Sequence, residues 1–345
     1  MSHAGMHALS ADLVHALVME GVGDGRSRRP PSLAAGSVRG MDERPPQLPD
    51  DLRAGRIPSQ SGRTWLVTGA TNGIGREVMR AAARAGARVI LPARDAERGA
   101  EVEAELRAIG AQARVLPLDL ADLASIRAFA EALDEPVDVL VNNAGAVTPR
   151  RRETRDGFEL VLGTNLLGPF ALTCQIADRV RGRVVVVGSG AHRAGRIDAR
   201  DPHFRHRRWS ISAAYAQSKL GDMLWARALQ RRLQLRGSGV DVQLAHPGWS
   251  HTNIQNVTGV ALLDRIVTEV TRPIAQPPAA GALPLLAAAV AELPPLTYLG
   301  PDGWRRWRGR PAGEQPSALA RDDSAADAVW ALCARETGVD LPGTG

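Results

Sequence analysis

The chain has 345 residues, of which 44% are hydrophobic and 4% aromatic, and its formal net charge is +6. Its two cysteines, Cys174 and Cys333, are too few for a disulfide-built domain or a cysteine metal cluster, and we expect both to be core residues in a reducing compartment. Only Lys219 is a lysine among the 43 lysines and arginines, so the basic excess indicates biased codon usage rather than nucleic-acid binding.

No apolar run reaches the roughly 18 to 20 residues needed to cross a bilayer. The nearest run, 282–291, contains a proline. No basic region followed by an apolar core of signal-peptide length stands at the N-terminus. We therefore expect a cytoplasmic protein without a transmembrane segment.

Residues 1–60 have a composition unlike that of the rest of the chain. Arginine and proline gather in clusters such as 28–31 and 44–49, and no periodic apolar pattern is sustained. Such a segment is predicted to be a disordered extension, and Met41 is an alternative start of the natural protein. The folded domain is then expected over 61–345.

From residue 64 onward, short β-rich runs alternate with longer segments rich in Ala, Leu, Glu and Arg. The β-rich runs are 64–68, 88–91, 113–116, 137–141, 183–187, 240–245 and 296–299. The predicted helices include 97–109, 123–133, 158–180 and 213–235. This alternation is typical of a single doubly wound α/β (Rossmann) domain, with a parallel sheet of about seven strands and helices on both faces. Ligands of such sheets bind at the carboxyl ends of the strands.

The first β-rich run ends in a glycine-rich turn, Thr68-Gly-Ala-Thr-Asn-Gly-Ile-Gly75, which leads into a predicted helix. Its three glycines permit a tight turn and the close approach of a pyrophosphate, which the amides and dipole of the helix N-terminus would stabilise. The alternative is an ordinary glycine-rich strand-to-helix turn. The position between a strand and a helix makes that alternative the weaker interpretation.

Tyr215 and Lys219 lie four residues apart in a predicted helix, so their side chains share one face. A phenol with a pKa of about 10 is a poor acid or base at neutral pH, and a neighbouring ammonium favours its ionised form. The chain has only two tyrosines and one lysine, so this spacing is improbable by chance. The pair is predicted to be catalytic rather than an exposed helical pair without function.

These motifs resemble those of the classical short-chain dehydrogenase/reductase family. The glycine spacing is Gly-x-x-x-Gly-x-Gly, and the further matches follow in the family's order: Asp119-Leu120, Asn142-Asn-Ala-Gly145, Asn165, Ser189, Tyr215-Ala-Gln-Ser-Lys219, Pro247-Gly248 and Thr252. The resemblance covers the chain from about residue 61 to its end. Within the family, the stretches 152–159 and 298–303 are most similar to the retinol dehydrogenase and protochlorophyllide reductase-like branch.

The resemblance implies an oxidoreductase that interconverts a carbonyl and an alcohol by hydride transfer. Tyr215 would be the acid and base, and Lys219 would lower its pKa and hold the nicotinamide ribose. Ser189, which follows a valine-rich run, would orient the substrate oxygen at the carboxyl end of a central strand. Asn165 would help to hold a water that connects Lys219 with solvent; alternatively it is a polar residue that bends its helix. The implied coenzyme contacts are Thr68, Gly69, Thr71, Asn72, Gly73, Ile74, Gly75, Asp119, Leu120, Asn143, Ala144, Gly145, Tyr215, Lys219, Pro247, Gly248 and Thr252.

The end of the second β-rich run indicates the coenzyme. A carboxylate there would bind the ribose hydroxyls of NAD, whereas an arginine accommodates the 2′-phosphate of NADP. Ala93 occupies the usual acidic position and Arg94 follows it, while Asp95 is expected to cap the next helix. The sequence therefore favours NADP(H) over NAD(H), the alternative being that Arg94 is a plain surface residue.

Three segments outside the main motifs carry weaker predictions. Residues 249–280 are expected to form a lid whose apolar face either lines the substrate pocket or packs on the sheet; in the first case the substrate is apolar. The tail 300–345 contains the run Trp304-Arg-Arg-Trp-Arg-Gly-Arg310, which mixes aromatic and basic residues as single-strand nucleic-acid binders do, but we expect it to pack beside the pocket. Residues 203–209 lack metal-ligand spacing and are predicted to be a loop over the active site.

A rival interpretation is a non-catalytic NADP-binding regulator or scaffold, since this fold can bind a coenzyme without turnover. Such a protein would be expected to lack Ser189, Tyr215 or Lys219, and all three are present. The predicted partner is a small carbonyl or alcohol substrate, without metal or nucleic acid. Homo-oligomer formation, the substrate's identity and the favoured direction stay open.

Overall fold

The computed structural model describes residues 47–249 and 276–342 of the chain. Residues 1–46, Thr252 and most of the expected lid therefore lie outside the described residues.

The packed chain begins before residue 61, which corrects the domain boundary expected from the sequence. Helix α2 (Asp50–Arg53) precedes the first strand and contacts helix α10 (Pro278–Val290). Leu48 and Leu52 are buried in one of the two main core clusters. Leu48 lies just before α2 and Leu52 lies in it, so this short segment buries two leucines without the sustained periodicity that identifies a longer helix.

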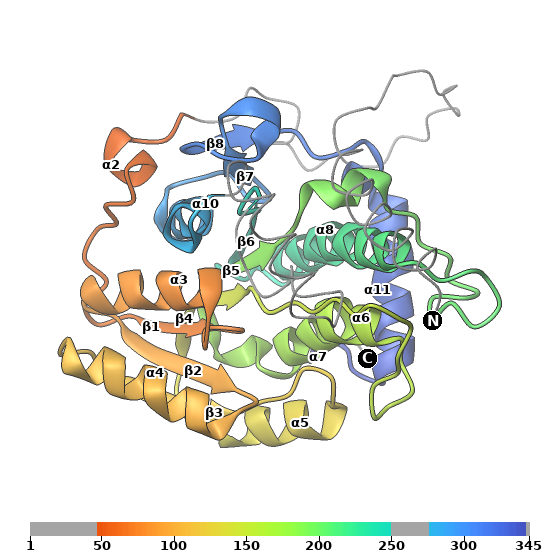
Figure 1. The fold of residues 1–345 in the computed structure, drawn as a ribbon, viewed down its shortest axis with the longest axis horizontal. Coiled ribbons are helices and arrows are strands. Elements are labelled where there is room, and N and C mark those ends of the chain that lie inside the picture. Colours follow the sequence, from red (N-terminus) through yellow and green to blue (C-terminus); the bar gives the residue numbers. More distant parts are fainter. Residues whose placement is uncertain (1–46, 250–275, 343–345) are drawn as a thin grey trace, which may run out of the picture.

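Within the described residues, eight strands form one sheet in the order β3-β2-β1-β4-β5-β6-β7-β8 (Figure 1). Their bounds are β1 (Thr64–Val67), β2 (Arg88–Ala93), β3 (Ala113–Pro117), β4 (Val137–Asn142), β5 (Val180–Val187), β6 (Asp241–Ala245), β7 (Tyr298–Pro301) and β8 (Pro311–Glu314). The first seven pair in parallel, which confirms the predicted sheet, and β8 is antiparallel to β7. β8 was not predicted because its sequence, Pro-Ala-Gly-Glu, has no β-branched or aromatic residue.

Helices cover both faces of the sheet, as predicted. One core cluster joins the sheet to α5 (Leu123–Ala132), α7 (Gly168–Gln175), α8 (Ile211–Leu235) and α11 (Asp323–Thr337). The other joins it to α3 (Gly73–Arg84), α4 (Ala96–Ala108) and α10. Because side chains on both faces are covered, the central strands are continuous runs of buried apolar residues rather than alternating ones, as in Trp65, Leu66 and Val67.

The helix predicted over 158–180 is divided. α6 (Leu160–Leu162) leads into a π-helical turn, η2 (Gly163–Leu167), and α7 follows. Asn165 lies in the π turn, and the chain then passes through η3 (Ala177–Arg179) into β5. Such turns are rare and occur often at functional sites.

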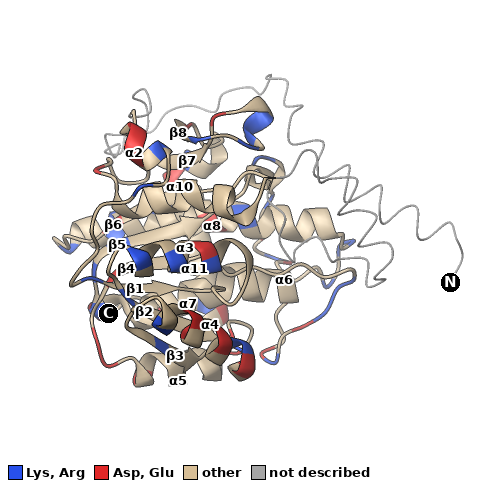
Figure 2. Cartoon of the chain, turned by 60° about the vertical axis from the view of Figure 1, so that its left-hand side comes forward, with Lys and Arg blue, Asp and Glu red and all other residues tan. Residues whose placement is uncertain are grey.

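Acidic and basic residues both occur along the outer helices α3 and α4 (Figure 2). Arg76 and Arg80 of α3, for example, pair with Glu105 of α4, and Arg80 also pairs with Glu77 at 2.7 Å. These two arginines of α3 are thus paired locally with carboxylates of α3 and α4.

Candidate active site

The glycine-rich turn joins β1 to α3 at the carboxyl end of the sheet. Gly69 and Gly73 have φ angles of +68° and +52°, a region that side-chain-bearing residues rarely adopt. A Cβ at Gly75 would lie 2.5 Å from the Gly69 carbonyl oxygen, so only glycine allows the helix to start this close to the turn. No side chain caps the helix at Asn72, which leaves the first-turn amides available to an anion. Thr71, Asn72 and Ile74 complete this turn.

The segment after β4 is attached to the same turn. The Thr68 hydroxyl accepts hydrogen bonds from the backbone N–H groups of Asn143 and Ala144, both at 3.0 Å. In return, Asn143 Nδ2 donates to the Thr68 carbonyl oxygen at 2.9 Å. The predicted coenzyme residues 143–145 thus lie beside the glycine-rich turn, at the switch point between β1 and β4 where such sheets bind ligands.

The ends of β2 and β3 lie on the same edge of the sheet. Arg94 is exposed directly after β2, and Asp95 caps α4 by accepting hydrogen bonds from the N–H groups of Glu97 at 3.1 Å and Arg98 at 3.2 Å, as predicted. After β3, Asp119 accepts from the N–H of Ala121 at 2.9 Å. Leu120, which follows it, is buried.

Ser189 follows β5 and caps the short helix η4 (Gly190–Ala194). Its Oγ accepts a hydrogen bond from the N–H of Ala191 at 3.2 Å, so its own proton can be directed elsewhere. His192, which sequence reasoning missed, supports this turn. Its Nε2 accepts from the N–H of Ser317 at 3.1 Å, so Nδ1 carries the ring proton and donates to the Ser189 carbonyl oxygen at 2.6 Å. Burial lowers the pKa of His192 to about 4, and the ring is neutral at physiological pH.

Tyr215 and Lys219 lie on one face of α8, as predicted. Lys219 Nζ is 5.9 Å from the centroid of the Tyr215 ring. The lysine side chain is buried, and Nζ donates to the Val187 carbonyl oxygen at 2.8 Å and to Asp222 Oδ2 at 2.9 Å. The interpretation as an exposed helical pair is therefore wrong, and a buried ammonium lies beneath a half-buried phenol.

Asn165 is held beside this pair from the π turn. Its Oδ1 accepts from the N–H of Ala146 at 2.7 Å, and its Nδ2 donates to the Ala146 carbonyl oxygen at 3.0 Å and to Ser218 Oγ at 3.2 Å. The side chain therefore connects the segment after β4 with the residue that precedes Lys219.

Beyond β6, Pro247 and Gly248 lie at the same edge of the sheet. Gly248 has a φ of +64°, and a Cβ there would lie 2.4 Å from the Trp307 carbonyl oxygen. Trp307 is buried against Trp249, at 5.1 Å between ring centroids, whereas Trp304 is 65% exposed. The run 304–310 thus packs beside the site through one of its two tryptophans, Trp307.

The sequence matches the family model described as short chain dehydrogenase over residues 63–260, more than half of the chain. The chain belongs to this family. Polyprenol dehydrogenase of Mus musculus is 41% identical to this dehydrogenase over 307 residues, which are 85% of this chain and 89% of the relative. Retinol dehydrogenase 13 of Homo sapiens is 34% identical over 328 residues, which are 90% and 96% of the two chains. The predicted likeness to the retinol dehydrogenase branch is confirmed, and the chain is an oxidoreductase of that family.

Solved structures agree with the fold. The crystal structure of an uncharacterized protein from Mycobacterium paratuberculosis has a TM-score of 0.71 and 39% identity, and the match covers 84% of this chain and 98% of that one. A gluconate 5-dehydrogenase homologue from Beutenbergia cavernae with bound NADP has a TM-score of 0.52 and 30% identity, over 67% and 91% of the two chains. Among residues 47–249 and 276–342, no helix combines the length and apolar character needed to span a bilayer.

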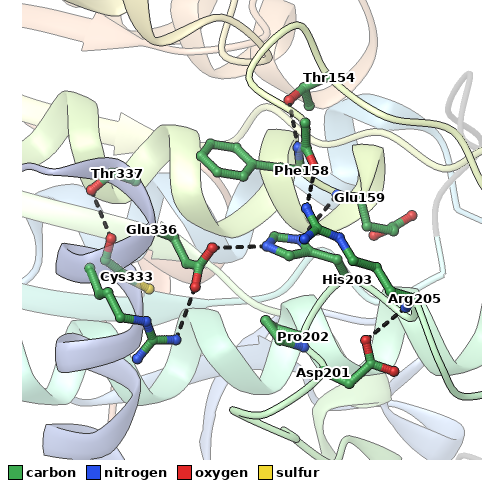
Figure 3. Close-up of polar contacts among 12 residues, drawn as sticks. Thr154, Phe158, Glu159, Asp201, Pro202, His203, Arg205, Cys333, Glu336 and Thr337 are labelled. Carbon is green, nitrogen blue, oxygen red and sulfur yellow. Dashed lines mark hydrogen bonds and ion pairs between the residues drawn. The ribbon is translucent and has the colours of Figure 1, made fainter.

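Residues 203–209, which were predicted to be a loop over the active site, are attached to the rest of the dehydrogenase through His203 (Figure 3). His203 stacks on Phe158 at 5.6 Å between ring centroids. Its Nδ1 accepts from the N–H of Glu159, at the start of α6, at 3.1 Å, and its Nε2 contacts Glu336 Oε2 of α11 at 3.0 Å. The loop therefore joins two helices that are far apart in the sequence.

A small apolar cluster packs against the Tyr215 ring. Val161, Phe204 and Ala214 form a small buried cluster, and the partly buried rings of Trp209 and Tyr215 pack against it. Trp209 is fixed by Glu159, whose Oε1 accepts from its indole N–H at 3.1 Å. We call Val161, Phe204 and Trp209 the apolar wall.

Proposed function

We propose that this dehydrogenase interconverts an apolar alcohol and its aldehyde or ketone with NADP(H). The observation that carries the proposal is the half-buried Tyr215 above the buried Lys219, with Ser189 at the end of the neighbouring strand β5. This set of groups supplies a proton donor, a cation that favours its ionised form and a donor for the substrate oxygen.

When bound, the coenzyme supplies the hydride in reduction and accepts it in oxidation. In reduction, Tyr215 donates its proton to the carbonyl oxygen as the C–H bond forms, and in oxidation the phenolate takes the proton from the alcohol. Ser189 donates a hydrogen bond to the same oxygen. Its Oγ accepts from the N–H of Ala191, and this bond does not use the hydroxyl proton. Lys219 stabilises the phenolate, and His192 keeps the serine turn in place through the Ser189 carbonyl oxygen.

The residues present fit a dinucleotide. The uncapped N-terminus of α3 and the glycines at 69 and 73 suit its pyrophosphate, and 143–145 lie next to that turn. Arg94 supports NADP because Ala93, not a carboxylate, is the last residue of β2 and the Arg94 side chain is exposed directly after it.

Arg94→Ala should weaken NADPH binding by about 1.5 to 3 kcal/mol, the range for a hydrogen bond to a charged group, and leave NADH binding almost unchanged. Fluorescence titration with both coenzymes measures this. Arg98→Ala is the matched control, because Arg98 is exposed one turn further along and contacts Asp95 at 3.5 Å. An equal loss for NADPH and NADH would show that Arg94 does not bind the 2′-phosphate.

The apolar wall beside Tyr215, together with relatives named for polyprenol and retinol, supports a long apolar alcohol as substrate. With NADP⁺ and primary alcohols of increasing chain length, each buried methylene should add about 0.8 kcal/mol to the transition-state binding that kcat/KM reports. Retinol and a short isoprenoid alcohol extend the series.

Two substitutions connect this length dependence to the wall. Trp209→Ser should flatten the profile, whereas Trp209→Phe keeps an apolar ring and should preserve it. A wild-type profile without length dependence, or better turnover of polar substrates, contradicts the apolar substrate. Coenzyme binding without turnover of any alcohol or carbonyl would support a non-catalytic role instead.

A further inference from the structure

Asp222 is a buried carboxylate on α8, next to the catalytic lysine, that sequence analysis did not single out. Its Oδ2 accepts from Lys219 Nζ at 2.9 Å, and its Oδ1 accepts from Trp225 Nε1 at 3.3 Å. The side chains of Lys219 and Asp222 are 7% and 3% exposed. The lysine that acts on Tyr215 is therefore one half of a buried ion pair.

The charge state of this pair follows from its contacts. Burial alone would lower the pKa of Lys219, but Asp222, and after it Tyr215, outweigh burial, so the pKa of the ammonium is raised. Burying an ionised carboxylate destabilises the folded protein unless the carboxylate is paired and hydrogen-bonded. Asp222 accepts from both an ammonium and an indole N–H. Burial raises the pKa of Asp222, and the ammonium of Lys219 and the indole N–H of Trp225 oppose that rise. We take both Lys219 and Asp222 as charged because these two donors lie at 2.9 Å and 3.3 Å from the carboxylate oxygens.

Other described elements packed against α8 bring few ionisable groups to this region. From η4 comes His192, which is neutral, and from α11 comes Cys333, whose pKa is raised by burial, so the thiol is neutral too. Glu159 at the start of α6 has a pKa raised by burial and accepts from Trp209. At the end of β6, His246 lies 3.3 Å from Glu314. Among the described side chains, Asp222 and Tyr215 are the ionisable partners of Lys219.

We propose that Asp222 is a positioning residue that partly neutralises Lys219 and thereby keeps the Tyr215 hydroxyl protonated, ready to donate its proton in carbonyl reduction. The proposal rests on the proposed function of Tyr215 and adds an electrostatic control by a residue outside the Tyr215–Lys219 motif.

The charge balance explains the direction of the effect. With Asp222 in place, losing one proton from the Tyr215–Lys219 site changes the buried group from neutral to a net charge of −1. With asparagine in its place, the same loss changes the site from +1 to neutral. Burial favours the neutral state, so the proton is lost at lower pH in the variant, whichever of the two coupled groups releases it.

The chain has only two tyrosines, so the ionisation of Tyr215 can be observed directly. In a Tyr298→Phe background, the tyrosinate absorbance as a function of pH reports Tyr215 alone, and adding Tyr215→Phe confirms the assignment. Asp222→Asn should move this ionisation to lower pH by about one unit. The pH profile of kcat/KM for alcohol oxidation should move in the same direction.

Trp225→Phe is the matched control, because it deletes the other hydrogen bond to Asp222 without changing the charge. Its tyrosinate titration should equal that of the background. Asp222→Ser is a second neutral variant, to be used if Asp222→Asn does not fold. The wild-type protein gives a further test without any substitution, because its absorbance should show no tyrosinate at neutral pH.

An unchanged titration in Asp222→Asn, an equal shift in Trp225→Phe, or a tyrosinate already formed at neutral pH in the wild type would overturn the proposal. These readouts are independent of turnover. A wild-type protein that titrates as expected but converts no alcohol would refute the proposed function and leave the role of Asp222 standing.

Discussion

Tyr215→Phe is expected to lower kcat/KM by about 10² to 10⁴-fold while leaving NADPH affinity nearly unchanged. The substitution removes one oxygen atom, which is the proton donor, and keeps the ring that packs against the apolar wall. Initial rates of NADPH oxidation with a carbonyl substrate, compared with a coenzyme titration, separate the two effects.

Tyr298→Phe is the natural control, because it removes the same hydroxyl from the chain's other tyrosine, a buried residue of β7. That variant should retain turnover. Near-normal turnover in Tyr215→Phe would mean that another group transfers the proton, and the mechanism proposed here would then be wrong.

Lys219→Arg should lower kcat/KM nearly as much, although every other lysine or arginine position in this chain is an arginine. Nζ fits between the Val187 carbonyl oxygen at 2.8 Å and Asp222 at 2.9 Å, in a site where the side chain is buried. A planar guanidinium is larger and cannot place a compact charge at that point. We expect at least about a 10²-fold loss of kcat/KM and a lower melting temperature, since overpacking costs about 1 to 3 kcal/mol.

The opposite exchange, Arg227→Lys, provides a control on the same helix. Arg227 pairs with Asp323 at 2.6 Å, away from the active site, and its replacement should leave turnover intact. Full activity in Lys219→Arg would show that any cation suffices near Tyr215 and that the tight fit around Nζ has no catalytic role.

Motifs that are local in sequence were predictable. The glycine-rich turn, the Tyr215–Lys219 spacing and the Asp95 cap each depend on residues within a few positions of one another. The seven parallel strands were also identified correctly, because each is a short run of β-branched or apolar residues.

Features that depend on distant contacts were missed. His192 supports the serine turn only because the N–H of Ser317 lies at its Nε2. Glu159 holds Trp209 and His203, which follow it by more than 40 residues in the sequence. The π turn at Asn165 has no strong sequence signal either. Asp222 is different, because its spacing from Lys219 is visible in the sequence; what could not be seen was that both side chains are buried.

The contact between His192 and Ser317 has a consequence for when the enzyme becomes competent during synthesis. A nascent chain folds from its N-terminus, so the glycine-rich turn and the strands from β1 to β6 are released from the ribosome before residue 317. Ser189, Tyr215 and Lys219 have then been translated, yet the backbone of the serine turn still lacks Ser317, the residue that holds His192. The residues of the coenzyme site therefore leave the ribosome before the serine turn is complete. A chain that ends before Ser317 contains Ser189, Tyr215 and Lys219 but lacks the His192–Ser317 contact that supports the turn of Ser189.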